Sequence, residues 1–203
     1  FHWCNYCFNK NFTKARMLYP ICIRYAFAGF NGLSVIDMQS LDVTVVNNDA
    51  IRRENISDIY LDSRGLLWVG STNGLYVLDG QTYSSVARFN TNEGLQNDVV
   101  TAIIEDNDKN MWVTTISGMT NIVVTLNPRE ENYTFSTYKY NHLDGFMNSS
   151  TNNRAIKKTS YGEIMVGGTQ GINIFRPDQI KYNREVQDVR FTGVYVLGNP
   201  VKM

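Results

Sequence analysis

A repeat along the chain limits the possible folds more than any other feature of the sequence. Residues 56–77 read ISDIYLDSRGLLWVGSTNGLYV, and residues 100–115 read VTAIIEDNDKNMWVTT. Trp68 and Trp112 occupy equivalent positions and lie 44 residues apart. A repeat of this length indicates a chain built from similar supersecondary units that stack on one another.

Two weaker copies extend the repeat in both directions. Residues 155–172 form a later copy, in which Met165 stands in the tryptophan position at a spacing of 53 residues from Trp112. Residues 28–37 resemble residues 69–79 and form an earlier, partial copy. The sequence therefore contains three copies and the tail of a fourth.

Each copy is predicted to form four short strands. In the first full copy the strands are expected at residues 56–61, 66–71, 75–78 and 83–89. Asp62 to Gly65 has the composition of a hairpin turn, because Asp accepts bonds from the turn backbone and Gly adopts positive φ. We take Asn110 as the counterpart of Gly65 in the second copy, since Asn tolerates the left-handed region. Many β-branched and aromatic residues also favour strands, so the fold class is all-β.

Four antiparallel strands at this spacing are typical of the blades of a β-propeller. We interpret Trp68 and Trp112 as core residues between blades, although tryptophan also serves as a stacking platform for sugars. Propellers close with about four to eight blades, so these copies form an incomplete propeller with an open apolar face. We expect association between chains or marginal stability.

The repeats resemble the two-component regulator propeller repeats of extracytoplasmic sensor regions in bacterial hybrid two-component systems. The resemblance rests on the pattern D-x-x-G-x-x-W-V-G-x-x-x-G-L at residues 62–75 and on EGLQND at residues 93–98, with weaker echoes at 106–118 and 162–172. It implies that an immunoglobulin-like domain follows the propeller, and residues 189–201 look like its first strand and hairpin.

These observations divide the chain into three parts. Residues 1–27 are unassigned, because they contain four basic residues, no acid and all three cysteines, unlike the rest of the sequence. Residues 28–182 are predicted to be a partial β-propeller with three blades and part of a fourth. Residues 183–203 are predicted to be a linker and the first strand of the immunoglobulin-like domain.

The resemblance also implies a function. The chain is expected to be a periplasmic, ligand-sensing fragment of an inner-membrane protein that signals to a histidine kinase, and the implied ligand is an oligosaccharide. The expected partners are the remaining blades, the immunoglobulin-like domain and a second copy of the chain. The alternatives are a scaffold that binds proteins and a carbohydrate-active lyase or glycosidase.

In a propeller, the links between blades and the turns between second and third strands form one face. Loops rich in Asn, Asp and Tyr on such a face suit a ligand with many hydroxyl groups. The candidate ligand-binding residues are Asn73, Asn97, Asp98, Ser117, Asn141, His142, Asp144, Asn148 and Arg154. The alternative is that each of these side chains only caps a turn.

Other functional classes find little support in the sequence. Nineteen basic and nineteen acidic residues give no net charge, which argues against binding to nucleic acid. No nucleophile elbow, phosphate loop or dinucleotide fingerprint is present, so we expect neither catalysis nor a cofactor. The sequence leaves paired carboxylates open, because the fold sets their separation. No membrane span or signal peptide is apparent.

Two motifs resemble metal sites but are incomplete. Cys4 and Cys7 form a Cys-x-x-Cys pair without the two further ligands that a zinc site requires. Residues 106–110 resemble the start of a calcium loop, but Met111 and Ser117 occupy positions that require Gly and Glu. We interpret residues 106–110 as the turn between the first two strands of the second copy.

Overall fold

The chain folds into successive antiparallel sheets. The computed structural model describes residues 17–21, 24–29, 32–37, 40–130, 132–147, 150–180, 194–196 and 199–201. The first sheet contains β1 (Met17–Ile21), β2 (Arg24–Gly29), β3 (Gly32–Asp37) and β4 (Val43–Val45), in that order. The second contains β5 (Ile56–Leu61), β6 (Leu66–Ser71), β7 (Gly74–Asp79) and β8 (Ser85–Phe89).

The same up-and-down topology continues through the rest of the chain. The third sheet contains β9 (Val100–Glu105), β10 (Met111–Thr115), β11 (Gly118–Asn127) and β12 (Asn132–Tyr140). After the short 3-10 helix η1 (His142–Asp144) come β13 (Thr151–Lys158), β14 (Ile164–Gly168) and β15 (Gly171–Phe175), then η2 (Pro177–Gln179). The last described elements are β16 (Val194–Val196) and β17 (Asn199–Val201), which pair with each other. The all-β prediction is confirmed.

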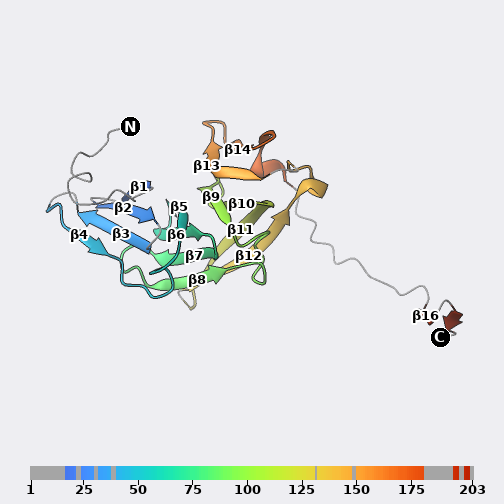
Figure 1. Cartoon of the computed structure of the whole chain (residues 1–203), viewed down its shortest axis with the longest axis horizontal. Coiled ribbons are helices and arrows are strands. Elements are labelled where there is room, and N and C mark those ends of the chain that lie inside the picture. Colours follow the sequence, from blue (N-terminus) through green and yellow to red (C-terminus); the bar gives the residue numbers. More distant parts are fainter. Residues whose placement is uncertain are drawn as a thin grey trace.

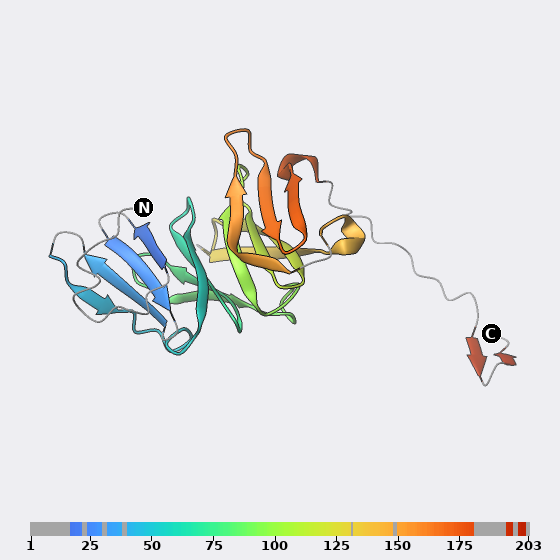
Figure 2. The ribbon, with the colours of Figure 1, turned by 45° about the horizontal axis from the view of Figure 1, so that its top comes forward.

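The first four sheets lie side by side, each packed on the next (Figures 1 and 2). An apolar core lies between each pair of neighbouring sheets. Strands β6 and β7 are buried along almost their whole length because the second sheet has a neighbour on both faces. This stacking of four-stranded sheets is the arrangement of propeller blades.

The two repeated tryptophans lie in these cores. The Trp68 side chain is fully buried between the second and third sheets, where its ring stacks on Phe89 and meets the edge of Phe135. Trp112 is fully buried between the third and fourth sheets, with its ring 4.9 Å from that of Phe175. The interpretation of both residues as core residues is confirmed.

Each tryptophan is tied to the turn that precedes its strand. The Trp68 indole N–H donates to Asp62 Oδ2 at 2.9 Å, and Asp62 Oδ1 accepts the backbone N–H groups of residues 64 and 66. Asp106 makes the same bonds to Trp112 and to the backbone of residues 108 and 110. This set of bonds explains why the Asp and Trp positions repeat together.

The fourth sheet keeps this turn with different side chains. Thr159 Oγ1 accepts the backbone N–H groups of residues 161 and 163, as the aspartates do in the other sheets. Met165 occupies the tryptophan position, and its side chain has no N–H group that would need a second acceptor atom. Replacement of Trp by Met is therefore matched by replacement of Asp by Thr.

The left-handed residue of the second turn is Lys109, so the assignment of Asn110 to that position was wrong. Gly65 has φ 88° as predicted, and Lys109 has φ 63° at the equivalent position three residues after Asp106. Asn110 instead donates its backbone N–H to Asp106. The predicted location of residues 106–110, between the first and second strands of the sheet, is confirmed.

The strand boundaries differ from the prediction at three places. Tyr83 lies in the β7–β8 turn with φ 59°, and β8 begins at Ser85. The first sheet is four-stranded, because β1 and most of β2 come from residues 17–27, which the sequence analysis left unassigned. The fourth sheet has three strands among the described residues.

Residues 1–16, with Cys4 and Cys7, lie outside the described residues. The β16–β17 pair lies within the predicted hairpin at 189–201, and its assignment to an immunoglobulin-like domain stays a prediction. Within the part of the chain that is described, no helix has the length and apolar character needed to cross a membrane.

Candidate ligand-binding face

One end of the sheets gathers the connections that the sequence analysis associated with a ligand. We define the link face by the links between sheets (residues 46–55, 90–99, 141–147 and 150) and the turns at 72–73, 116–117 and 169–170. Hydrogen bonds join each turn to the link before its sheet, from Thr72 N–H to Asn55 O, Ile116 N–H to Val99 O and Thr169 N–H to Ser150 O. Links and turns therefore form a continuous surface.

A cluster of polar side chains lies on the link face of the second sheet. Glu54 accepts hydrogen bonds from Asn73 Nδ2 at 3.0 Å and from the Tyr76 hydroxyl at 3.1 Å. The Arg88 guanidinium lies 5.1 Å from the centre of the Tyr76 ring and donates to Asn73 O. Burial and the neighbouring Glu54 carboxylate raise the pKa of Tyr76, so its hydroxyl stays protonated and donates to Glu54.

Several predicted residues stabilise the links themselves. Asn97 Oδ1 accepts from Val99 N–H at 2.9 Å, and Asp98 Oδ1 accepts from Thr91 N–H at 2.7 Å. Asn141 caps η1 by accepting from Leu143 N–H, while Asp144 accepts from Asn141 N–H. These bonds are made within each link, so each of these four side chains stabilises its own link.

The innermost strands β5, β9 and β13 meet near the link face and contain buried polar groups. The Thr101 hydroxyl bonds to the hydroxyls of Thr114 and Thr151, and Ser57 Oγ donates to Val100 O at 2.6 Å. Asp58 Oδ2 accepts the backbone N–H of Ile103 at 2.8 Å across the boundary between sheets. Polar side chains thus join the three blades around their common edge.

Asp58 is the most perturbed acid among the described residues. Burial raises its pKa to about 6, against the opposing effects of the Ile103 and Ile59 N–H groups and the positive charge of Arg154. A carboxyl group with such a pKa titrates close to neutral pH, which often marks a functional site but also occurs in structural networks.

The predicted site residues are spread over the links, two turns and the start of β13. Asn73, Ser117 and His142 are exposed on the link face, and Arg154 is exposed near the start of β13. Asn97, Asp98, Asn141 and Asp144 lie in the links. Asn148 lies outside the described residues. The hydrogen bonds of Asn73, Asp98 and Asn141 go to nearby groups of the links, on Glu54, Thr91 and Leu143 respectively, rather than to one another.

Sequence reasoning missed four residues that belong with this face: Glu54, Asp58, Tyr76 and Arg88. A signal for Glu54 was present, because it lies 44 residues before Asp98 and is therefore its equivalent in the repeat. Asp58 had no such signal, since its environment depends on β9 and β13. Tyr76 and Arg88 lie in strands, where the sequence pattern indicates only structure.

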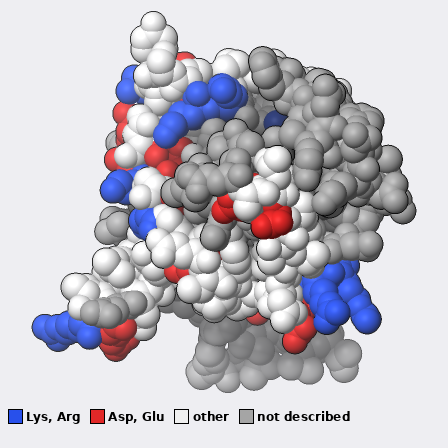
Figure 3. Space-filling model, turned by 90° about the vertical axis from the view of Figure 1, so that its left-hand side faces the viewer, with Lys and Arg blue, Asp and Glu red and all other residues white. Residues whose placement is uncertain are grey.

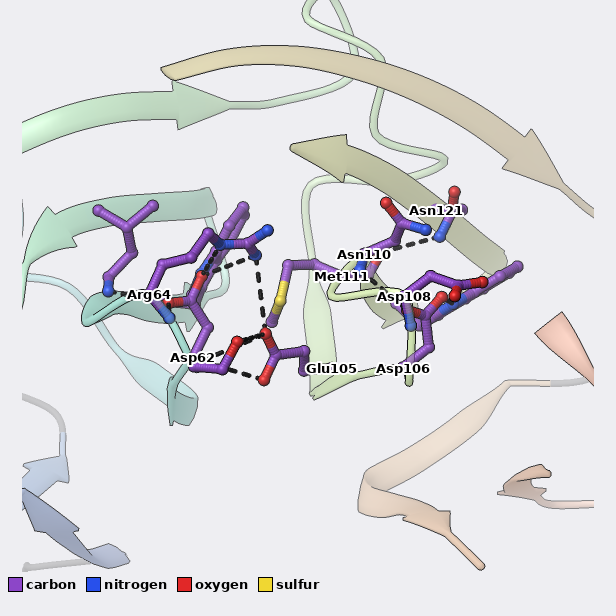
Figure 4. A network of polar contacts seen from close by, with 12 residues as sticks. Asp62, Arg64, Glu105, Asp106, Asp108, Asn110, Met111 and Asn121 are labelled. Carbon is purple, nitrogen blue, oxygen red and sulfur yellow. Dashed lines mark hydrogen bonds and ion pairs between the residues drawn. The ribbon is translucent and has the colours of Figure 1, made fainter. Parts of the chain in front are cut away.

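The opposite end of the sheets contains a separate polar network. The buried Glu105 carboxylate accepts from the Ser63 hydroxyl and backbone N–H, and lies 3.9 Å from the Arg64 guanidinium, which also pairs with Asp62 (Figure 4). These groups join the β5–β6 turn to the end of β9. They satisfy one another, so we assign them a structural role.

The surface charge agrees with the balanced composition. On the side of the molecule drawn in Figure 3, basic and acidic side chains are interspersed over the described residues. Within the described part of the chain, no three His, Cys, Asp or Glu residues gather as metal ligands.

The fold and its repeats define a segment of a β-propeller. Two stretches, residues 51–73 and 94–117, match the family described as two component regulator propeller. These two stretches, in the second and third sheets, therefore match two-component regulator propeller repeats, as the sequence indicated. A curated relative, histidine kinase P4 of Formosa agariphila, is 28% identical over 111 residues, which cover 55% of this chain and 7% of that protein.

Solved structures show the same fold. The extracellular domain of BT4673 from B. thetaiotaomicron, assigned as a one component system, gives a TM-score of 0.65 at 19% identity, covering 85% of this chain and 24% of that one. The extracellular domain of BT3049 from B. thetaiotaomicron, assigned as a hybrid two component system, gives a TM-score of 0.52 at 18% identity. This match covers 81% of this chain and 28% of that one. A streptogramin B lyase gives a TM-score of 0.56 at 14% identity, covering 82% of this chain and 56% of that one. The chain spans about a quarter of the two extracellular domains.

Proposed function

We propose that this chain is a ligand-sensing propeller segment of a hybrid two-component sensor, located outside the cytoplasm. The observation that supports this most strongly is the match of two blades to two component regulator propeller repeats. Similarity to a histidine kinase and the shared fold with extracellular domains of such systems support the same function. Signalling would pass to domains beyond the blades described above.

We further propose that the ligand is an oligosaccharide and that it binds to the link face. Asn and Asp side chains on this face supply amide and carboxylate groups, which bond well to sugar hydroxyls. In the cluster of the second sheet, the buried Tyr76 holds the Glu54 carboxylate and lies under the Arg88 guanidinium, so Glu54, Asn73 and Arg88 are the polar groups it adds to this face. Asn97 and Asp98 on this face, and Arg154 beside it in β13, are the residues that we would test first.

The test compares a link-face variant with a matched variant at the opposite end. Replacement of Asn97, Asp98 and Arg154 by Ala should weaken binding of an oligosaccharide mixture at least tenfold in calorimetry. The control replaces Gln81, Asn107 and Asp108, three exposed residues of the opposite turns, by Ala and should bind like the parent chain. Circular dichroism checks that both variants are folded. Unchanged affinity in the link-face variant would refute the assignment.

A further inference from the structure

The first strands of the second, third and fourth sheets each contain a bulge near the link face, and the bulge in β13 is larger than those in β5 and β9. In β5, Ser57 is the one extra residue between the pairs Ile56 with Ser71 and Asp58 with Gly70. In β13, pairing passes from Thr151 with Gly168 to Ile156 with Val166, so residues 152–155 stand opposite Gly167 alone. The β13 bulge therefore contains three extra residues.

The smaller bulges have an evident structural role. Ser57 in β5 donates its hydroxyl to the backbone of β9, and Thr101, the extra residue of β9, bonds to Thr114 and to Thr151 of β13. Each of these bulges thus directs a short hydroxyl side chain toward the boundary between two blades. The three extra residues of β13 lie before Ala155 and are Asn152, Asn153 and Arg154, all exposed.

The backbone of this bulge is strained at Arg154. Its φ is 58°, in the left-handed region that costs a residue with a side chain roughly 1 kcal/mol or more. A glycine would relieve this strain, yet the sequence has a long cationic side chain there. Bulges commonly redirect side chains beside functional sites, and the Arg154 side chain at this bulge is exposed.

Arg154 also lies beside the inner strands of the other blades. β13 packs against both β9 and β5, and the Asp58 carboxylate of β5 interacts electrostatically with Arg154. We propose that the β13 bulge is an oxyanion-binding site, in which Arg154 with the amides of Asn152 and Asn153 binds a carboxylate or sulfate group of the ligand. The proposal rests on the proposed function and specifies an acidic oligosaccharide.

The residue types fit this ligand chemistry. A guanidinium group presents paired N–H donors that match two oxygens of a carboxylate or sulfate, which an ammonium group cannot do with the same geometry. Amide side chains add neutral donors and acceptors for neighbouring hydroxyls. All three residues are exposed, and Arg154 also interacts electrostatically with Asp58.

The experiment uses the 203-residue chain, three Arg154 variants and a charge-matched control. The probes are uronate oligosaccharides, their neutral methyl esters, sulfated oligosaccharides and inorganic sulfate, with calorimetric affinity as the readout. We expect Arg154→Gln to weaken binding of an acidic probe at least tenfold and Arg154→Lys to restore only part of it. Arg154→Gly should lose binding while its melting temperature stays equal or rises. Lys157→Gln, an equal charge change at an exposed position of β13, should bind like the parent.

Each outcome distinguishes this inference from the function on which it rests. Uronate or sulfated probes that bind in an Arg154-dependent manner support both, and the preferred probe identifies the oxyanion. Equal binding of methyl esters and acids, unaffected by Arg154→Gln, overturns the oxyanion site and leaves oligosaccharide sensing intact. Arg154-dependent binding of sulfate alone supports the site and contradicts the oligosaccharide. Binding of none of the probes overturns both.

Discussion

At the scale of single residues, pairs of side chains repeat together because one satisfies the other. Asp62 and Asp106 each accept an indole N–H from a buried tryptophan, and the fourth sheet replaces both partners with Thr159 and Met165. A buried donor left without an acceptor costs about 1–3 kcal/mol. The repeat therefore preserves the pair rather than either residue alone.

This pairing predicts non-additive effects of mutation in the third sheet. Asp106→Thr and Trp112→Met should each destabilise the chain by about 2–4 kcal/mol, through an unpaired indole and a cavity respectively. The double variant should be less destabilised than the sum by roughly 0.5–3 kcal/mol. Urea denaturation measures the free energy of unfolding of all three variants. The control combines Asp106→Thr with Trp68→Met, because these two side chains share no hydrogen bond. Additivity in the Asp106 and Trp112 cycle would contradict the argument.

Asp58 predicts a pH dependence of stability. Burial raises its pKa from 3.8 to about 6, so the folded chain binds more protons than the unfolded chain between these values. Stability therefore falls as pH rises through this interval, by on the order of 3 kcal/mol in total. Asp58→Asn keeps an acceptor for Ile103 N–H and should remove this fall. Denaturation curves at several pH values give the free energy of unfolding of both proteins. If this free energy falls equally from pH 4 to pH 7 in both, Asp58 is not responsible.

At the scale of elements, contacts between blades combine apolar surfaces with a few buried polar bonds. Glu105, at the end of β9, accepts two hydrogen bonds from Ser63 in the β5–β6 turn. Hydrogen bonds to charged groups contribute about 1.5–3 kcal/mol, more than neutral ones. This bond set fixes the second sheet on the third at the end opposite the link face.

Removal of the Glu105 charge should loosen this contact. Glu105→Gln keeps one oxygen acceptor but weakens both bonds, with an expected loss of about 1–2 kcal/mol in the free energy of unfolding. Glu130→Gln, at an exposed turn of the same sheet, should change it by less than about 0.5 kcal/mol. Equal effects of the two substitutions in chemical denaturation would remove the role assigned to Glu105.

Strands and turns could be predicted from the sequence because their signals are local. The Asp62 to Gly65 turn and strands β5 and β6 follow directly from turn residues and apolar runs. The left-handed Lys109 was missed because its residue type carries no turn signal, and the pairing of Thr159 with Met165 became clear only from the hydrogen bonds. For the candidate site, the sequence identified the link face, whereas Asp58 and the β13 bulge depend on contacts between blades.

At the scale of the whole molecule, the fourth sheet exposes a surface that is covered in the second. Leu75 and Val77 are fully buried by the third sheet, while their equivalents Ile172 and Ile174 are 66% and 57% exposed. Burying a side chain of this size contributes about 1.5–3 kcal/mol. The described part of the chain therefore has an apolar blade surface without a covering sheet.

This surface predicts that isolated chains associate. Light scattering should give a mass above that of the monomer, and Ile172→Asn with Ile174→Asn should shift it to the monomer because these replacements remove the apolar contact. Leu126→Asn, at another exposed apolar position, should leave the mass unchanged. A parent chain that is monomeric at high concentration would contradict the prediction.

Hydrogen exchange with and without oligosaccharide tests the central claim most directly, because it locates a ligand on one face of the blades. The account predicts slower exchange in the links at residues 90–99 and 141–147, in the turns at 72–73 and 116–117, and in the β13 bulge. Turns at the opposite end, residues 62–65 and 106–110, should exchange at unchanged rates. Protection confined to those opposite turns would contradict a ligand-sensing link face.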